Sequence, residues 1–146
     1  MSDEASVKPT TLFWVVAALF LIWGLIGCWI YLAEVIPSDE KYAEMFGEDY
    51  ASVRHLVPTW GIAGFATAVW SGLLASILFI LRKRLSVPVF ILSLVAAIIG
   101  FLPVFTNSTI REAYGPSFWV MPLIVVSLGI FEIFYSRKQR ANGILR

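Results

Sequence analysis

The sequence predicts an all-α membrane protein, an antiparallel four-helix transmembrane bundle with up-down-up-down topology. Two observations lead to this prediction. Hydrophobic residues make up 59% of the 146 residues and charged residues only 14%, a balance far from that of a soluble domain. The apolar residues also fall into four long runs, each long enough to cross about 30 Å of hydrocarbon. We therefore expect one four-span membrane domain over residues 1–146.

The four predicted spans cover about residues 12–34, 58–81, 87–105 and 117–135. The first is too long for a cleaved signal peptide, and no A-x-A site follows it. Residues 25–28, Leu-Ile-Gly-Cys, have the form of a lipoprotein signal, but residues 29–32 continue the apolar run. We therefore favour a membrane helix capped by Thr10 or Thr11, with Cys28 as a buried packing residue and lipidation of Cys28 as the alternative.

The connection at residues 37–57 is polar and acidic, yet apolar residues recur in it at spacings of three or four. This pattern predicts an amphipathic segment, capped by Ser38 and broken at Gly47, along the membrane surface or over one end of the bundle. A solvated loop with some helix is the alternative. Residues 106–116 are expected to form a polar connection, and Pro103 to kink or end the third span.

Small residues on the second and third spans predict the closest helix contact, because residues four apart share one face of a helix. The second span carries two such rows, one of them being Ala63, Thr67, Ser71 and Ala75. The expected packing residues are Gly64, Ala68, Gly72 and Ser76 on the second span and Ser93, Ala97 and Gly100 on the third. The second row leaves a further contact open, to the first helix or to another protein.

Basic residues cluster on one side of the predicted bundle. That side carries both chain termini and the short turn between the second and third spans, with Arg82, Lys83 and Arg84. Because basic residues favour the cytoplasmic face, we expect a multi-pass protein of the bacterial inner membrane with both termini in the cytoplasm. The expected partners are the bilayer, with anionic lipids at the cytoplasmic face, and a membrane protein or a second copy, but no nucleic acid.

Ionisable groups inside a membrane are the first candidates for function. Glu34, at the external end of the first span, and Glu132, near the cytoplasmic end of the fourth, are such groups. A structural role is expected for both, Glu132 pairing with Arg82 or Arg84; proton or cation coupling is the alternative for Glu132. Trp70 and Trp23 lie nearer the middle of their spans than the other tryptophans and are candidates for ligand contact by stacking.

The chain lacks the sequence patterns of common catalytic and cofactor sites. It has one histidine, His55, in the first connection, and one cysteine, so neither a multi-cysteine metal site nor an internal disulfide is available. No glycine-rich phosphate loop, nucleophile elbow or paired-carboxylate motif is present. We therefore expect no enzyme activity, no catalytic or metal-binding residues and no cofactor.

Several segments resemble a family of small bacterial four-span proteins. They include Pro58, Trp60, Phe65, Gly72, Leu74 and Ser76, then Leu81-Arg82-Lys83, residues 88–94 (PVFILSL), Tyr114-Gly115-Pro116, Met121-Pro122 and the tail from Tyr135 to Gly143. The resemblance covers roughly residues 12–146. Members are usually described as uncharacterised or as sugar transporters, so the resemblance implies a four-span bundle and names transport as one function.

Two functions are consistent with these residues. The first is a non-enzymatic membrane protein that acts by helix association, as an accessory subunit of a membrane complex or as a homo-oligomer. The alternative is a small oligomeric transporter of a neutral solute such as a sugar. Spans almost free of charge favour the first, because secondary transporters commonly place polar or broken helices at mid-membrane.

Overall fold

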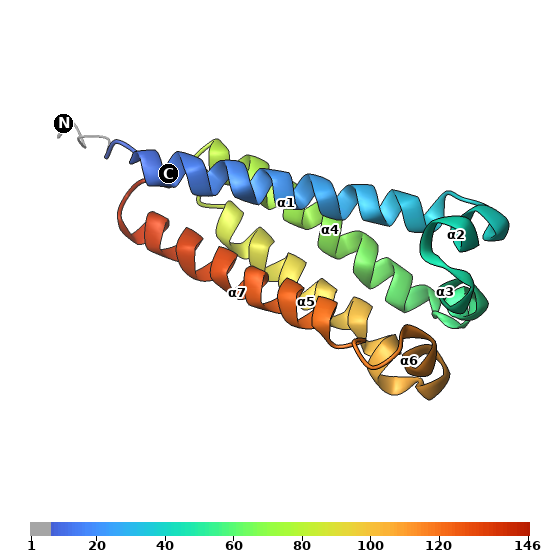
Figure 1. Ribbon diagram of the computed structural model, residues 1–146. Helices are drawn as coiled ribbons and strands as arrows, with labels where there is room; N and C mark the ends of the chain where they lie inside the picture. Colours follow the sequence, from blue (N-terminus) through green and yellow to red (C-terminus); the bar gives the residue numbers. More distant parts are fainter. Residues whose placement is uncertain (1–6) are drawn as a thin grey trace.

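The computed structural model describes residues 7–146 and confirms an all-α fold with four helices long and apolar enough to span a membrane (Figure 1). The long helices are α1 (Thr11–Val35), α4 (Thr59–Ile80), α5 (Ser86–Thr106) and α7 (Val120–Ala141). The connections contain α2 (Asp39–Phe46), α3 (Glu48–Val53), α6 (Ser108–Tyr114) and the single turn η1 (Arg54–Leu56). The described residues contain no strand. The chain is therefore a multi-pass membrane protein; residues 1–6 of the predicted domain lie outside the described part.

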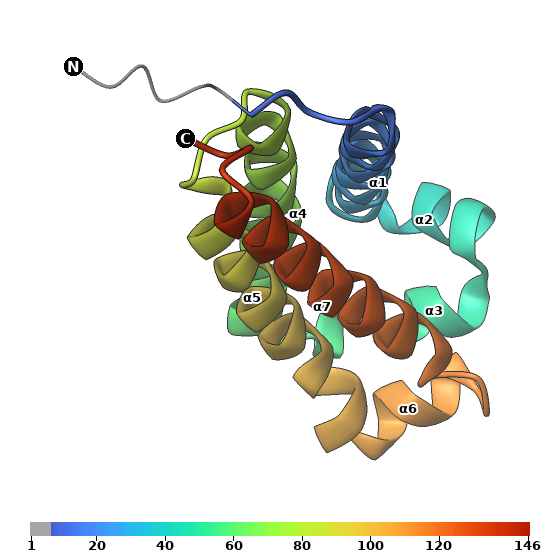
Figure 2. The same cartoon turned by 90° about the vertical axis from the view of Figure 1, so that its left-hand side faces the viewer.

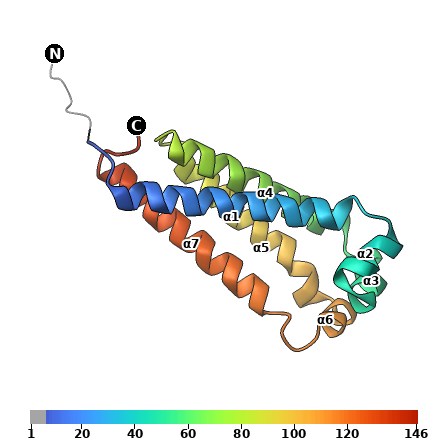
Figure 3. The ribbon, with the colours of Figure 1, turned by 45° about the horizontal axis from the view of Figure 1, so that its top comes forward.

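The long helices alternate in direction, so the connections gather at two ends of the bundle (Figure 1). One end holds the α4–α5 turn and residues 142–146, and we call it the basic end after Arg82, Lys83 and Arg84. The other end, which holds α2, α3 and α6, we call the capped end. Figure 2 shows α4 between α1 and α5, with α7 against α5. Helices α1 and α7 converge at the basic end and diverge toward the capped end (Figure 3).

The α4 and α5 backbones approach closely because glycines face each other. A Cβ atom added to Gly64 would lie 2.9 Å from the backbone nitrogen of Gly100. Ser93 adds a hydrogen bond across this contact by donating to the carbonyl oxygen of Ala68 at 2.7 Å. The structure thus places the small residues of the second and third spans against each other, in the helix pair joined by the shortest turn.

All four spans meet around Phe79 in the half of the bundle nearer the basic end. The side chain of Phe79 is fully buried. Its ring centroid lies 4.8 Å from that of Phe13 and 5.3 Å from that of Phe20, both on α1. It also lies 6.2 Å from Phe90 on α5 and 6.0 Å from Tyr135 on α7. These five rings form the aromatic cluster that holds the spans together.

The C-terminal residues fold back and close the basic end. Leu145 is fully buried and packs in the same core as the aromatic cluster. The Arg82 side chain donates from Nε to the carbonyl oxygen of Ile144 at 2.9 Å, and the backbone N–H of Arg146 donates to the carbonyl of Arg82 at 2.7 Å. A tail that the sequence marks mainly by its basic residues therefore contributes an apolar plug.

The capped end follows from local capping. Ser38 accepts a hydrogen bond from the backbone N–H of Lys41 at the start of α2, and the helix ends at Gly47, whose φ of 102° suits glycine. A further helix, α6, interrupts the connection expected at residues 106–116. Asn107 begins it, because its side-chain oxygen accepts hydrogen bonds from the N–H groups of Thr109 and Ile110 at 3.0 and 3.3 Å.

Two helix boundaries differ from the apolar runs that predict them. Helix α7 begins at Val120 and continues to Ala141, past the last apolar residue of the run, because arginine, lysine and glutamine are good helix formers outside the bilayer. Helix α5 continues through Pro103 to Thr106. The Pro103 ring is buried against α4, where a Cβ atom on Gly61 would lie 2.7 Å from its Cγ. Close packing therefore accommodates the proline without ending the helix.

Candidate functional site

Glu132 is an acidic residue inside a membrane-spanning part of the bundle. Glu132 is only 7% exposed and lies on the inward face of α7. One turn before it, Gly129 packs against Leu94 of α5; one turn after it, Ser136 is fully buried. The neighbouring Phe131 and Tyr135 place their rings 5.9 and 6.0 Å from Phe20 of α1. Glu132 is therefore level with the contact between α7 and α1.

No hydrogen bond or ion pair reaches the Glu132 carboxyl group from residues 7–146. Pairing with Arg82 or Arg84 is not observed, because both guanidinium groups turn to the C-terminal tail: Arg82 bonds to Ile144, and Arg84 donates to the carbonyl oxygen of Leu145 at 3.3 Å. The sequence places these charges at one end of the bundle but does not show that the tail binds the arginines.

Glu34 lies at the opposite end, where Arg54 joins three segments of the chain. The Arg54 guanidinium donates to the backbone carbonyl of Glu34 at 2.6 Å and to that of Pro37 at 3.1 Å. It also pairs with the Asp39 carboxylate at 2.9 Å and lies 4.5 Å from the centre of the Tyr42 ring. Arg54 thus fastens η1 to the end of α1 and the start of α2.

Replacing Arg54 by alanine is expected to loosen α2 and α3 while the spans keep their packing. Hydrogen bonds to charged groups contribute about 1.5–3 kcal/mol, so amide exchange in α2 and α3 should accelerate at least about tenfold. Hydrogen–deuterium exchange in detergent measures this directly. The exposed Lys41 of α2 provides the control through Lys41→Ala. Unchanged exchange in Arg54→Ala would show that Arg54 does not hold the capped end.

Two tyrosines pack beside this arginine-centred contact. Burial raises the pKa of Tyr42, and burial raises the pKa of Tyr114 further, with the neighbouring Tyr42 and Glu34 adding to the effect. Tyr50 stacks on Tyr114 with ring centroids 4.7 Å apart. Both phenols are therefore neutral at physiological pH and pack as uncharged rings.

The structure places the candidate tryptophans on different surfaces. Trp70 is 46% exposed on α4, and its ring lies 6.4 Å from that of Tyr31 on α1. Trp23 is half-buried on α1. Neither the hollow between α2 and α3 nor the one between α5 and α7 includes either ring. Cys28 is buried and its thiol donates to the carbonyl oxygen of Val69 at 3.4 Å, which places it in the α1–α4 contact.

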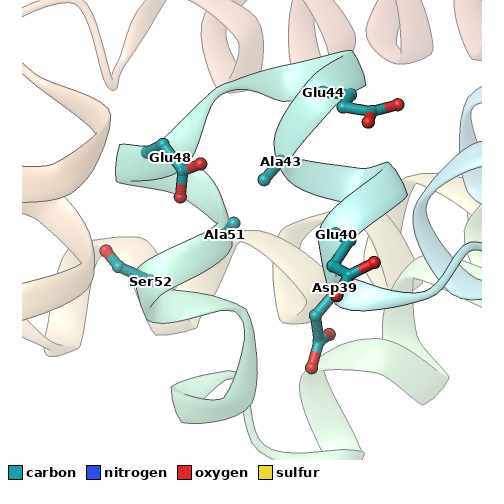
Figure 4. A pocket seen from close by; sticks show the side chains of 7 residues that line it. All are labelled: Asp39, Glu40, Ala43, Glu44, Glu48, Ala51 and Ser52. Atoms are coloured by element: carbon teal, nitrogen blue, oxygen red, sulfur yellow. The ribbon is translucent and has the colours of Figure 1, made fainter.

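Acidic side chains gather on the surface between α2 and α3, as Figure 4 shows. The polar residues that line this shallow surface are Asp39, Glu40, Glu44, Glu48 and Ser52. Within residues 7–146 no group of three or more histidine, cysteine or acidic residues could hold a metal ion. A second hollow, between α5 and α7, is almost wholly apolar, with Phe101, Phe105 and Trp119 in its wall. Neither surface brings Glu34 and Glu132 together.

No protein-family model, curated protein or solved structure matches this chain. The resemblance to small bacterial four-span proteins therefore remains an expectation from the sequence.

Proposed function

We propose that this protein is a non-enzymatic integral membrane protein that acts by helix association, as a homo-oligomer or as an accessory subunit of a membrane complex. The outward face of α4 is the observation that supports it. Trp60 and Trp70 are 50% and 46% exposed there. Between them, Ala63 and Thr67 are also exposed, so two small side chains lie between two large ones. Small side chains on a lipid-facing helix allow a second helix to approach closely.

The two small-residue rows of α4 differ in what they contact. In the first row, Gly64 and Gly72 face α5, and Ser76 donates to the carbonyl oxygen of Phe20 on α1 at 3.1 Å. In the second row, Ser71 and Ala75 are buried within the chain. Ala63 and Thr67 belong to this row but are exposed, in the half of α4 nearer the capped end. The row therefore continues beyond the contacts that the chain itself supplies.

The outward faces of α1 and α5 have a different character. On α1 the exposed residues include Leu19, Ile22 and Ile26; on α5 they include Val95, Ile98 and Leu102. Large aliphatic side chains of this kind mix well with lipid and need no protein partner. In the half of the bundle nearer the basic end, the aromatic cluster around Phe79 fills the interior of one chain, which favours association over transport through a single copy.

Adding bulk at the exposed small residues is expected to break the association. In a mild detergent, the wild-type protein should have the mass of at least two chains, or of one chain with a fixed partner. The double variant Ala63→Leu/Thr67→Leu should shift to the mass of one chain, because the added side chains prevent close approach. Light scattering coupled to size-exclusion chromatography measures the mass.

Val95→Leu provides the matched control, since it adds bulk to the outward face of α5. A wild-type protein that is monomeric and without a partner would refute association. If the protein instead accumulates a labelled neutral solute in liposomes, and the double variant keeps that uptake, the transport alternative replaces it.

We also propose that the basic end faces the cytoplasm of a bacterial inner membrane. The capped end carries the acidic surface of α2 and α3, and the basic end carries Lys83 and Arg140 as exposed cations. This distribution agrees with the preference of basic residues for the cytoplasmic face. In a Cys28→Ser background, an impermeant maleimide applied to spheroplasts should label Ser52→Cys but not Ala141→Cys. The reverse pattern would invert the orientation.

A further inference from the structure

The inward face of α7 carries a buried polar stripe that helix packing does not require. Glu132, Ser136 and Gln139 follow one another at spacings of four and three, so they share one side of the helix. Their exposed fractions are 7%, 0% and 6%. At the same end, in the first turn of α5, Ser86 is fully buried and its hydroxyl has no hydrogen-bond partner among the described residues. Buried polar groups thus extend from Glu132 to the basic end.

Among residues 7–146, no hydrogen bond or ion pair stabilises a negative charge on Glu132. Helix α5, which packs against α7, and α4 beyond it have no titratable side chain between their first and last residues. On α1 the titratable groups all lie in the half toward the capped end: Cys28, Tyr31 and Glu34. On α7 itself the titratable residue nearest to Glu132 is Tyr135. The basic residues of this helix, Arg137, Lys138 and Arg140, are exposed. Arg82 and Arg84 are bound to the tail.

A carboxylate without a cation or donor in an apolar interior is so unfavourable that the group takes up a proton instead. An apolar residue would fill the same space without this requirement, so the carboxyl group is not explained by packing. We propose that Glu132 is a proton-binding site inside the membrane, and that its proton exchanges with water through the basic end, along Ser136 and Gln139. This site is independent of association through α4, because it lies on another helix and faces inward.

Carbodiimides of different polarity test where the carboxyl group lies and whether it is protonated. In lipid vesicles at pH 7.5, the apolar dicyclohexylcarbodiimide should modify Glu132, as located by mass spectrometry of peptides. A water-soluble carbodiimide should modify the exposed Glu44 instead and leave Glu132 unmodified. Glu132→Gln should lose the apolar label completely. Failure of the apolar reagent to label Glu132, or equal labelling of Glu132 and Glu44 by the soluble reagent, would overturn the proposal.

Infrared spectroscopy tests the protonation state without relying on a reagent. The wild-type spectrum minus that of Glu132→Gln should contain the carbonyl band of a protonated carboxylic acid, which shifts in D₂O. A difference made only of carboxylate bands would overturn the site. Gln139→Leu should slow the D₂O shift severalfold if the proton leaves through the basic end, whereas a leucine at the capped end, Tyr114→Leu, should not. Equal rates in all three proteins would overturn the route.

Discussion

Replacing Phe79 by alanine is expected to cause the largest loss of stability of any single change in the bundle. The cost should be about 3–5 kcal/mol of the free energy of unfolding, the range found for large aromatic side chains in packed interiors. In a membrane the loss comes from the cavity and the missing van der Waals contacts, since lipid is as apolar as the core. Removal of the Phe79 ring causes both losses, because the ring is fully buried and contacts rings from the other three spans.

Unfolding in mixed micelles of a mild detergent and dodecyl sulfate gives this free energy. Phe134→Ala is the matched control, because Phe134 is 66% exposed on α7 and lipid or detergent takes its place when it is removed. The control should lose less than about 1 kcal/mol. If both variants lost the same amount, the aromatic cluster would not be what joins the four spans.

Changing Gly64 to leucine is expected to force α4 and α5 apart, at a cost of about 3 kcal/mol, the upper end of the usual range for overpacked interiors. The atoms that a Cβ would meet belong to the backbone of the other helix: the nitrogen of Gly100 at 2.9 Å and the carbonyl oxygen of Ala96 at 3.1 Å. Backbone cannot rotate away as a side chain can. The same mixed-micelle unfolding measures the loss of stability. The Gly64→Leu variant should still insert into the membrane.

A graded series tests the origin of this effect. Gly72→Ala should cost less than Gly64→Ala, because the added Cβ meets the Ser93 hydroxyl, which can change rotamer. Ala18→Leu adds a leucine to an exposed position of α1 and should be close to neutral. Gly64→Leu with the stability of Ala18→Leu would mean that the α4–α5 contact is looser than the structure has it.

The sequence was most informative where one physical rule dominates. Apolar runs identify the four spans because a bilayer requires about 20 apolar residues per helix. The pairing of α4 with α5 followed from small residues such as Gly64 and Gly100, since close backbone approach leaves no room for anything larger. In the connection after α1, Ser38 and Gly47 act through neighbouring residues alone, so their roles are visible locally.

Contacts between distant residues could not be predicted in this way. Arg54 bonds to the carbonyl of Glu34, and Arg82 to that of Ile144; both acceptors are backbone atoms that every residue type carries. The burial of Leu145 depends on a tail that folds back onto the α4–α5 turn. For Glu132 the sequence suggested an arginine partner, and the structure leaves the carboxyl group without one because the tail occupies both arginines.

Cross-linking in native membranes tests most directly the claim that the chain associates through the outward face of α4. In a Cys28→Ser background, Thr67→Cys should form a disulfide-linked dimer on mild oxidation. Contact between two chains through this face brings the two copies of residue 67 close together, and a disulfide requires Cβ atoms about 3.5–4.5 Å apart. Val95→Cys, on the outward face of α5, should remain monomeric. Efficient cross-linking at position 67 alone is the result that the proposal predicts. Cross-linking at position 95 with none at position 67 would contradict it.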